Sequence, residues 1–277
     1  MPRVLLVGNH PEFAHGLETA PSLSGCDIET AAGNVDAVRR VRARAIDVLL
    51  TDPDTPVLDD LALVDELRAS RPGLRAIVLA PAAAPGEFIE AVRSHVFACF
   101  VAPFDVTAIA DMTRCAIDDV QWRDGISIES GLPDWISLKV SCGLVSAERL
   151  VHFMSEYRRD LPEPDRDSLM LAFREILMNA MEHGAGFDPE KVVDVTAVRT
   201  ERAIVYHFRD PGPGFDRQSL DRSALANTDA DPIAHLERRA EMGLRPGGFG
   251  MMVAMRLVDE MYYNQQGNEV LLIKRMA

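Results

Sequence analysis

The first 120 residues alternate between short apolar runs and longer amphipathic stretches, and this alternation restricts the possible folds more than any other feature of the chain. The apolar runs are Arg3–Val7, Ile46–Leu50, Ala76–Leu79 and Ala98–Val101, with a weaker run at Asp27–Ala31. Helical periodicity marks 11–20, 34–44, 59–70, 85–95 and 105–119. Near-continuous apolar strands alternating with helices are typical of a parallel sheet covered on both faces. The sequence therefore predicts a doubly wound α/β domain.

Three polar residues occupy informative positions in this pattern. Asn34 and Asp105 stand where two helical stretches begin, and short polar side chains at such positions cap the first turn of a helix. Asp52 follows directly after the third apolar run. Ligands of doubly wound sheets bind at the carboxyl ends of the strands, so Asp52 is a candidate functional residue.

The pattern changes near residue 125. The stretch from Gln121 to Pro133 has no helical period, and we predict a linker at 123–134 between one domain at 1–122 and another at 135–277. In the second domain the pattern predicts a strand at Ile136–Val140, helices at Ser146–Arg159 and Pro164–His183, a hairpin of Lys191–Val198 with Ala203–Phe208, a helix ending near Met261 and a strand at Glu269–Lys274. Strands in one layer and helices in another indicate an α+β sandwich.

Charge and cysteine usage narrow the function classes. The chain carries 43 acidic and 29 basic residues, a net charge of -14, which argues against nucleic-acid and anionic-membrane binding. No apolar run approaches the roughly 20 residues that a membrane span needs. The four cysteines are scattered, with no Cys-x-x-Cys pair, as in proteins of a reducing compartment. We expect a cytoplasmic protein with neither a nucleic-acid nor a membrane partner.

Three motifs of the second half suggest chemistry. Glu175, Asn179 and His183 are four residues apart, so they form one helical stripe whose carboxylate and amide oxygens suit Mg²⁺ or a proton transfer. Leu171, Ile176, Leu177 and Ala180 are expected to face the core instead. Asp210-Pro211-Gly212-Pro213-Gly214 follows a predicted strand, and its glycines permit a close backbone approach to a ligand. Gly247-Gly248-Phe249-Gly250 opens a helix, where free N–H groups bind phosphate.

Each motif alone is compatible with an ordinary helix face or turn, but the three in this order resemble the GHKL ATPase superfamily with its Bergerat nucleotide fold over about 135–277. Glu175-x-x-x-Asn179 matches the N box, and the two glycine motifs match the two glycine boxes. Details such as Asn179-Ala180-x-Glu182-His183-Gly184 and Val258-Asp259-Glu260 are similar to the anti-sigma-factor serine kinase branch.

The resemblance implies a protein-serine/threonine kinase that uses ATP and Mg²⁺. Glu175 would be the general base and Asn179 a Mg²⁺ ligand, while Asp210 would bind the adenine amine. Gly212 and Gly214 would shape the adenine pocket. The residues that would bind phosphate are Gly247, Gly248 and Gly250. The segment Phe215–Pro246 would be the ATP lid. The implied partners are an antagonist protein, a sigma factor and a second copy of the chain.

Residues 1 to about 120 resemble a response-regulator receiver domain, with Asp52 at the phosphoacceptor position. The sequence departs from that family where Gly8-Asn9-His10 replaces the acidic pair, Ala80 the hydroxyl residue and Ala102 the lysine. Mg²⁺ needs several oxygen ligands, and an acyl phosphate needs a neighbouring cation. We therefore predict a degenerate receiver that is phosphorylated slowly or not at all.

Two other functions remain open at this point. The second domain could be a non-catalytic module that binds a partner, because the chain already carries a receiver with a degenerate site. A histidine kinase fragment would instead need a phosphoaccepting histidine on a helix, and His152 is the candidate there. His152 lacks an acidic neighbour, which makes this third function the weakest of the three.

Overall fold

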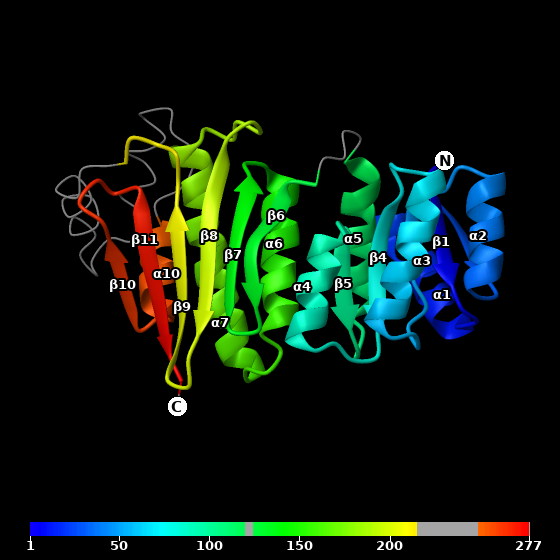
Figure 1. Ribbon diagram of the computed structural model, residues 1–277, viewed down its shortest axis with the longest axis horizontal. Helices are drawn as coiled ribbons and strands as arrows, with labels where there is room; N and C mark the ends of the chain where they lie inside the picture. The colour runs from blue at the N-terminus through cyan, green and yellow to red at the C-terminus, as the bar shows by residue number, and fades with distance from the viewer. Residues whose placement is uncertain (120–123, 215–248, 277) are drawn as a thin grey trace. The chain divides into compact units, whose positions relative to one another are not determined.

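The computed structural model describes residues 1–119, 124–214 and 249–276, and its contacts divide the chain into two compact units (Figure 1). Unit 1 comprises Met1–Pro133 with Glu148–Tyr157, and unit 2 comprises Asp134–Ala147 with Arg158–Ala277. Helix α6 (Leu144–Tyr157) therefore contributes its first turn to unit 2 and the rest to unit 1. None of the helices in these three ranges is long and apolar enough to cross a membrane.

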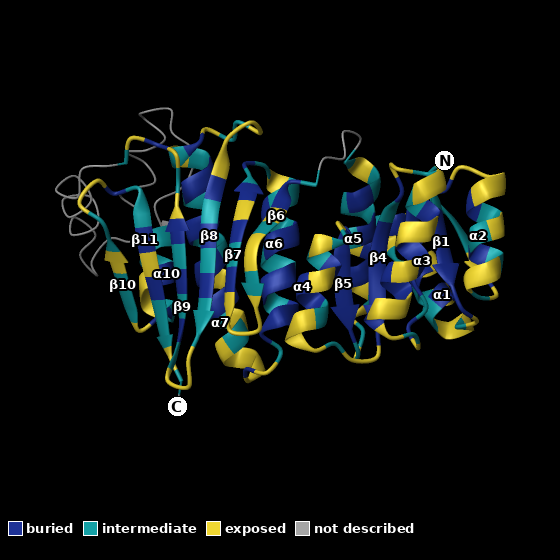
Figure 2. Ribbon diagram, viewed as in Figure 1, coloured by how far each residue is buried: buried dark blue, intermediate teal, exposed yellow. Residues whose placement is uncertain are grey.

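Unit 1 contains the predicted doubly wound sheet. Its five strands are β1 (Arg3–Val7), β2 (Asp27–Ala31), β3 (Val48–Leu50), β4 (Arg75–Ala80) and β5 (Ala98–Val101). They pair in parallel in the order β2-β1-β3-β4-β5. Strands β1, β3, β4 and β5 are buried on both faces, which explains their near-continuous apolar sequence (Figure 2), whereas most of the edge strand β2 is only half-buried. The predicted α/β fold class is confirmed for this unit.

Five helices cover the two faces of this sheet. They are α1 (Pro11–Thr19), α2 (Asn34–Ala43), α3 (Val57–Ser70), α4 (Pro85–Arg93) and α5 (Val106–Asp118). The side chain of Asp105 caps α5 by accepting from the amides of Thr107 and Ala108, as predicted. The predicted cap at Asn34 is wrong, because α2 begins at Asn34 and its cap residue is Gly33. The Asp36 carboxylate instead accepts from the Ala32 amide just before the helix.

A seven-residue strand, β6 (Ile126–Leu132), lies inside the stretch expected to be a linker. The interpretation of this stretch as irregular missed it because Trp122, the glycines and Pro133 dominate its composition. Ile126 and Ile128 alternate with Ser127 and Glu129, which is the two-residue period that a strand needs. Gly131 of β6 packs closely on Ile89 of α4, where a Cβ would lie 2.8 Å from a methyl carbon.

Unit 2 has an antiparallel sheet with helices packed on one face. Its strands are β7 (Trp135–Ser141), β8 (Val192–Arg199), β9 (Ala203–Arg209), β10 (Glu260–Tyr263) and β11 (Glu269–Arg275), in the order β10-β11-β9-β8-β7. Alternate residues such as Val195, Tyr206 and Leu272 are buried, and helix α7 (Glu163–Asn179) packs there through Phe173, whose ring is 4.9 Å from those of Tyr206 and Phe208. The predicted α+β architecture is confirmed.

The predicted helix up to Met261 is too long. Helix α10 (Phe249–Leu257) ends at Leu257, and Glu260–Tyr263 form strand β10. Tyr262 and Tyr263 are good strand formers, and Tyr262 pairs with Leu271 across the sheet. The tertiary pairing therefore decides the structure of a segment whose helical pattern had suggested continuation.

Candidate functional site

Helix α7 brings two of the predicted site residues onto one face. Glu175 and Asn179 are half-buried one turn apart, while Ile176 and Leu177 behind them are buried in the core. Leu171 was expected in the core but is 45% exposed. It lies one turn before Glu175, on the stripe of Glu175 and Asn179 rather than on the buried face. The buried face thus fixes the direction of the Glu175–Asn179 stripe.

The regular helix ends at Asn179, earlier than the predicted end at His183. Ala180–Gly184 form a π-helical turn, and the Phe187 amide then bonds to the carbonyl of Met181. Single π-helical turns are rare and are frequently found at functional sites. His183 is exposed in this turn, beyond the end of the regular helix that carries Glu175 and Asn179. No catalytic role is assigned to His183.

Glu175 lies against the start of α10. α7 and α10 pack together on the same side of the sheet (Figure 1). A Cβ built on Gly250 would overlap the Oε2 atom of Glu175. While the Glu175 carboxylate keeps this place, only a glycine fits at position 250. The N box and the second glycine motif, about 75 residues apart in sequence, meet here.

Asp210 lies against the π-helical turn that follows Asn179. It comes directly after β9, and its Oδ1 accepts from the Gly212 amide at 2.8 Å. A Cβ on Gly184 would overlap the Asp210 carboxylate, and one on Gly212 would lie 2.7 Å from the Gly184 Cα. Burial raises the pKa of Asp210, and the bond from Gly212 partly opposes this rise. Two glycines thus give Asp210 its place next to the end of α7.

Sequence reasoning missed two neighbours of Asp210. Tyr263 is half-buried, and burial together with the nearby negative charge of Asp210 raises its pKa to about 12. Asn268 bonds to the backbone of Asp210 through two hydrogen bonds. The cluster Asn264-Gln265-Gln266-Gly267-Asn268 is visible in the sequence as a turn signal, but a turn signal does not tell which loop it contacts.

The described part of the predicted nucleotide site is therefore brought together in unit 2. Glu175 meets Gly250, while Asp210 and Gly212 meet the turn after Asn179; Gly214, with φ of 78°, follows them. Gly247, Gly248 and the segment predicted as a lid, Phe215–Pro246, lie outside the described residues. A carboxylate and an amide oxygen one helical turn apart fit Mg²⁺, which prefers oxygen ligands. Gly250 leaves space beside the Glu175 carboxylate, and Gly184 and Gly212 leave space beside the Asp210 carboxylate, because a Cβ on any of the three would overlap these groups.

A second polar cluster lies at the carboxyl end of the parallel sheet in unit 1. His10 Nε2 is 2.9 Å from Asp52 Oδ1 and 4.0 Å from Asp54 Oδ2, and the Asp54 amide donates to Asp52 Oδ1. Gly8, with φ of 96°, gives this cluster room, since a Cβ there would lie 2.6 Å from Asp52 Oδ2. The imidazole thus occupies the place beside Asp52 where the receiver resemblance implies an acidic pair.

A buried acid lies next to this cluster. Asp60 of α3 is completely buried, and Thr51, the neighbour of Asp52, donates its hydroxyl hydrogen to Asp60 Oδ2 at 2.5 Å. Burial and then the charges of Asp52 and Asp59 raise the pKa of Asp60 to about 8, which the bond from Thr51 partly opposes. Asp60 is therefore largely a neutral acid near neutral pH.

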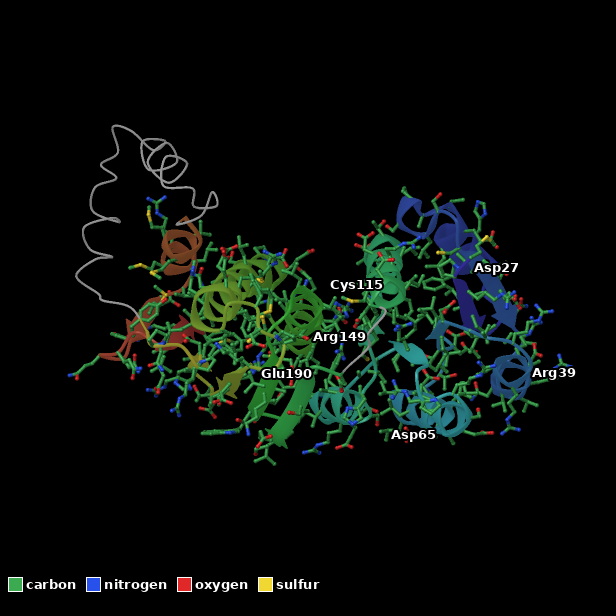
Figure 3. All side chains as sticks on the ribbon, turned by 90° about the horizontal axis from the view of Figure 1, so that it is seen from above. Asp27, Arg39, Asp65, Cys115, Arg149 and Glu190 are labelled. Carbon is green, nitrogen blue, oxygen red and sulfur yellow. The ribbon has the colours of Figure 1, made fainter. Side chains whose placement is uncertain are left out.

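His152, the candidate phosphoacceptor of the histidine kinase alternative, is engaged by strand β5. Its Nε2 donates to the Cys99 carbonyl at 2.9 Å, and its ring centroid lies 4.1 Å from that of Phe100. On the same helix, Glu156 accepts from the Val101 amide of this edge strand, and Arg149 donates to the Phe97 carbonyl just before it. Figure 3 labels Arg149, which is 4% exposed. His152 thus helps to cover a sheet edge, which disfavours a phosphoacceptor role.

Comparisons with known proteins agree with this two-part organisation. The histidine kinase-like ATPase domain family matches residues 144–274, and the response regulator receiver domain family matches residues 4–114. The chain is 30% identical over 112 residues to a response regulator receiver protein of Anaeromyxobacter sp. (strain Fw109-5), which is 40% of this chain and 47% of that protein. It is 35% identical over 68 residues to a transcriptional regulatory protein of Mycobacterium tuberculosis, which is 24% of this chain and 29% of that protein.

Solved receiver structures resemble part of the chain. A receiver domain protein from Clostridium thermocellum is 18% identical and covers 44% of this chain and 98% of its own, with a TM-score of 0.38. A response regulator from Thermotoga maritima is 19% identical and covers 43% and 99%, with the same TM-score. The chain spans about half the length, or less, of the curated relatives named above. Residues 144–274 are thus similar to histidine kinase-like ATPase domains, and residues 4–114 are similar to response regulator receiver domains.

Proposed function

We propose that the chain is a regulatory protein-serine/threonine kinase of the anti-sigma-factor type, which phosphorylates an antagonist protein at the expense of ATP. The observation that carries the proposal is the placement of the Glu175 carboxylate against Gly250, at the start of the helix that the second glycine motif opens. A carboxylate beside a phosphate-binding helix start is suitably placed to accept the proton of an attacking hydroxyl.

The other residues have complementary roles in this proposal. Asn179 would hold Mg²⁺, which would neutralise charge on the phosphates when bound. Asp210 would accept a hydrogen bond from the exocyclic amine of adenine, and Gly212 and Gly214 would shape the base pocket. Gly247, Gly248 and Gly250 would bind phosphate oxygens through backbone amides. Phosphoryl transfer depends mainly on positioning and charge neutralisation, both of which these residues would provide.

The proposed partners are an antagonist protein as phosphoacceptor, a sigma factor or similar regulated protein, and a second copy of the chain. The receiver domain would act without efficient phosphorylation, because His10 occupies the place of an acidic residue beside Asp52. The altered site around Asp52 also supports the second candidate function, a non-catalytic module that binds partners, because it shows that one domain of the chain has departed from its family's chemistry. Under that alternative the ATPase domain would retain a nucleotide or a partner without transferring phosphate.

Transfer of the γ-phosphate distinguishes the two functions. The full chain is incubated with γ-labelled ATP, Mg²⁺ and candidate antagonist proteins, and labelled serine or threonine is measured. Glu175→Gln should reduce transfer roughly 100- to 10,000-fold while ATP still binds. Glu163→Gln, an exposed residue in the first turn of the same helix, is the matched control and should leave transfer unchanged. Normal transfer by Glu175→Gln would contradict the proposed role of Glu175.

A further inference from the structure

The turn between β10 and β11 contacts the loop that carries Asp210. The Asn268 carbonyl accepts from the Asp210 amide at 3.0 Å, and the Asn268 side-chain Nδ2 donates to the Asp210 carbonyl at 3.3 Å. Both polar groups of the Asp210 backbone are thus bonded to one residue, 58 positions later in the chain. Asp210 is the last residue before the loop leaves the sheet, so these bonds fix where the loop begins.

Asn264 holds the turn itself in shape. Its Oδ1 accepts from the amides of Gly267, Asn268 and Glu269 at 2.7, 3.1 and 3.3 Å. Its Nδ2 donates to Asn268 Oδ1 at 2.9 Å. Because Oδ1 of Asn268 is engaged in this way, the other end of that amide, Nδ2, is directed to the Asp210 carbonyl. Asn264 therefore determines the orientation of the Asn268 side chain.

Gln266, in the same turn, contacts the far end of the loop. Its Nε2 donates to the Pro213 carbonyl at 3.3 Å, and a Cβ on Gly214 would overlap the Gln266 carbonyl oxygen. The loop 210–214 is consequently held at both ends by the five residues 264–268, which we call the clasp. Inside the loop, the Gly212 amide fixes the Asp210 carboxylate at 2.8 Å. Hydrogen bonds therefore run from Asn264 through Asn268 to the backbone of Asp210, and the bond from Gly212 within the held loop fixes the carboxylate.

We propose that the clasp positions Asp210 to distinguish bases by their exocyclic amine, with Asn268 and Asn264 as positioning residues. The inference rests on the nucleotide site proposed above. A carboxylate gains a directional hydrogen bond from an amine only when it is held in place, because its bond weakens steeply when misaligned. Loosening the clasp should thus affect nucleotides with an amine on the base and spare those without one. A clasp that serves only folding would show no such difference.

Adenosine and inosine triphosphates test this difference directly, since inosine carries a carbonyl where adenosine has the exocyclic amine. Dissociation constants of both are measured with Mg²⁺ on the full chain. In the unchanged chain ATP should bind more tightly than inosine triphosphate. Asn268→Asp removes the Nδ2 donor at constant shape and should weaken ATP binding roughly 3- to 10-fold, the value of about one hydrogen bond. Inosine triphosphate binding should change less than about twofold.

Two further variants complete the test. Asn264→Ala should reduce the preference for ATP over inosine triphosphate, as Asn268→Asp does. Asn264→Asp keeps an oxygen that accepts from the three turn amides, so it should retain part of this preference. Asn34→Asp makes the same chemical change at an exposed residue of α2 and should leave both affinities unchanged. Melting temperatures are recorded for every variant, so that loss of fold is recognised.

The outcomes separate this inference from the proposed function. If the unchanged, folded chain binds neither nucleotide, the proposed function fails and the inference fails with it. If it binds both with equal affinity, or if the clasp variants weaken both in parallel, the nucleotide site stands and the positioning role is overturned. Selective loss of ATP binding in Asn268→Asp and Asn264→Ala, with partial recovery in Asn264→Asp, supports the clasp.

Discussion

Gly250 and Glu175 occupy adjoining space, so that any side chain at position 250 would displace the Glu175 carboxylate. This relationship joins the fourth turn of α7 to the first turn of α10, two elements separated by the whole segment 180–248. The absence of a Cβ at position 250 leaves the Glu175 carboxylate its place, although alanine forms helices more readily than glycine.

The first prediction concerns this contact. Gly250→Ala should displace the Glu175 carboxylate and abolish or strongly reduce phosphate transfer, even though alanine favours helix formation. Gly86→Ala is the matched control, because Gly86 lies in α4 with open space around its missing Cβ. The control should keep transfer and gain up to about 1 kcal/mol of stability. Full transfer by Gly250→Ala would show that the Glu175 position is not required.

The second prediction concerns the adenine-binding role of Asp210. In the proposed role the ionised carboxylate would accept the amine hydrogen, and burial raises the pKa of Asp210. The preference for ATP over inosine triphosphate should therefore begin to fall at a higher pH than the ordinary aspartate pKa near 3.9 would allow. Protonation of the phosphates affects both nucleotides alike, so its effect cancels in the ratio of the two dissociation constants. A constant ratio from pH 7.5 down to about 4.5 would contradict this role.

The third prediction concerns the receiver domain. Beryllium fluoride with Mg²⁺ mimics an acyl phosphate, and it should not raise the melting temperature of the unchanged chain. The reason is that His10 supplies an imidazole beside Asp52 and Ala102 supplies no cation. The double variant His10→Asp, Ala102→Lys should restore a measurable rise. Samples with fluoride and Mg²⁺ but no beryllium serve as controls. A rise in the unchanged chain would show that the receiver site is functional.

The fourth prediction concerns the buried acid Asp60, whose pKa is raised to about 8. In the unfolded chain this group ionises near pH 3.9, so between about pH 4 and 8 the unfolded state releases a proton that the folded state keeps. The contribution of Asp60 to stability is therefore greatest at low pH and falls as the pH rises to about 8, by up to about 1.4 kcal/mol per pH unit.

Asp60→Asn removes this ionisation. Its unfolding free energy relative to the unchanged chain should increase with pH over that window, as measured by chemical denaturation. Asp65→Asn, at an exposed residue of the same helix, is the control and should follow the unchanged chain. If the difference between Asp60→Asn and the unchanged chain stays flat from pH 4 to 8, Asp60 does not have the raised pKa that its burial implies.

The sequence was most informative about unit 1, where strands such as β1 and β5 are nearly all apolar and need no tertiary information to be recognised. The sequence was less informative where strand pairing decides the structure of a segment. Strand β6 has seven residues and β10 has four, and both contain residues that are compatible with other structures. The π-helical turn after Asn179 has no sequence signal that distinguishes it from a continuing helix.

The candidate site shows the same division. Spacing predicted that Glu175 and Asn179 share a helix face, since the α-helical period is local. The resemblance, rather than spacing, suggested that Asp210 belongs with them. The receiver resemblance put His10 in the stretch that replaces the acidic pair near Asp52. Neither spacing nor resemblance indicated that Asn268 would bond to Asp210, because that contact depends on the path of loops across the fold. Long-range contacts of polar side chains carry no periodic signature.

The proposed function requires that unit 2 binds ATP together with Mg²⁺ through Asn179 and its neighbours. Calorimetric titration of ATP and Mg²⁺ into the full chain measures this binding, with Asn179→Ala and the exposed control Asn34→Ala titrated in parallel. We expect saturable binding of one nucleotide per chain, weakened at least about tenfold in Asn179→Ala and unchanged in the control. A folded chain that binds no ATP, or an Asn179→Ala variant with full affinity, would contradict it.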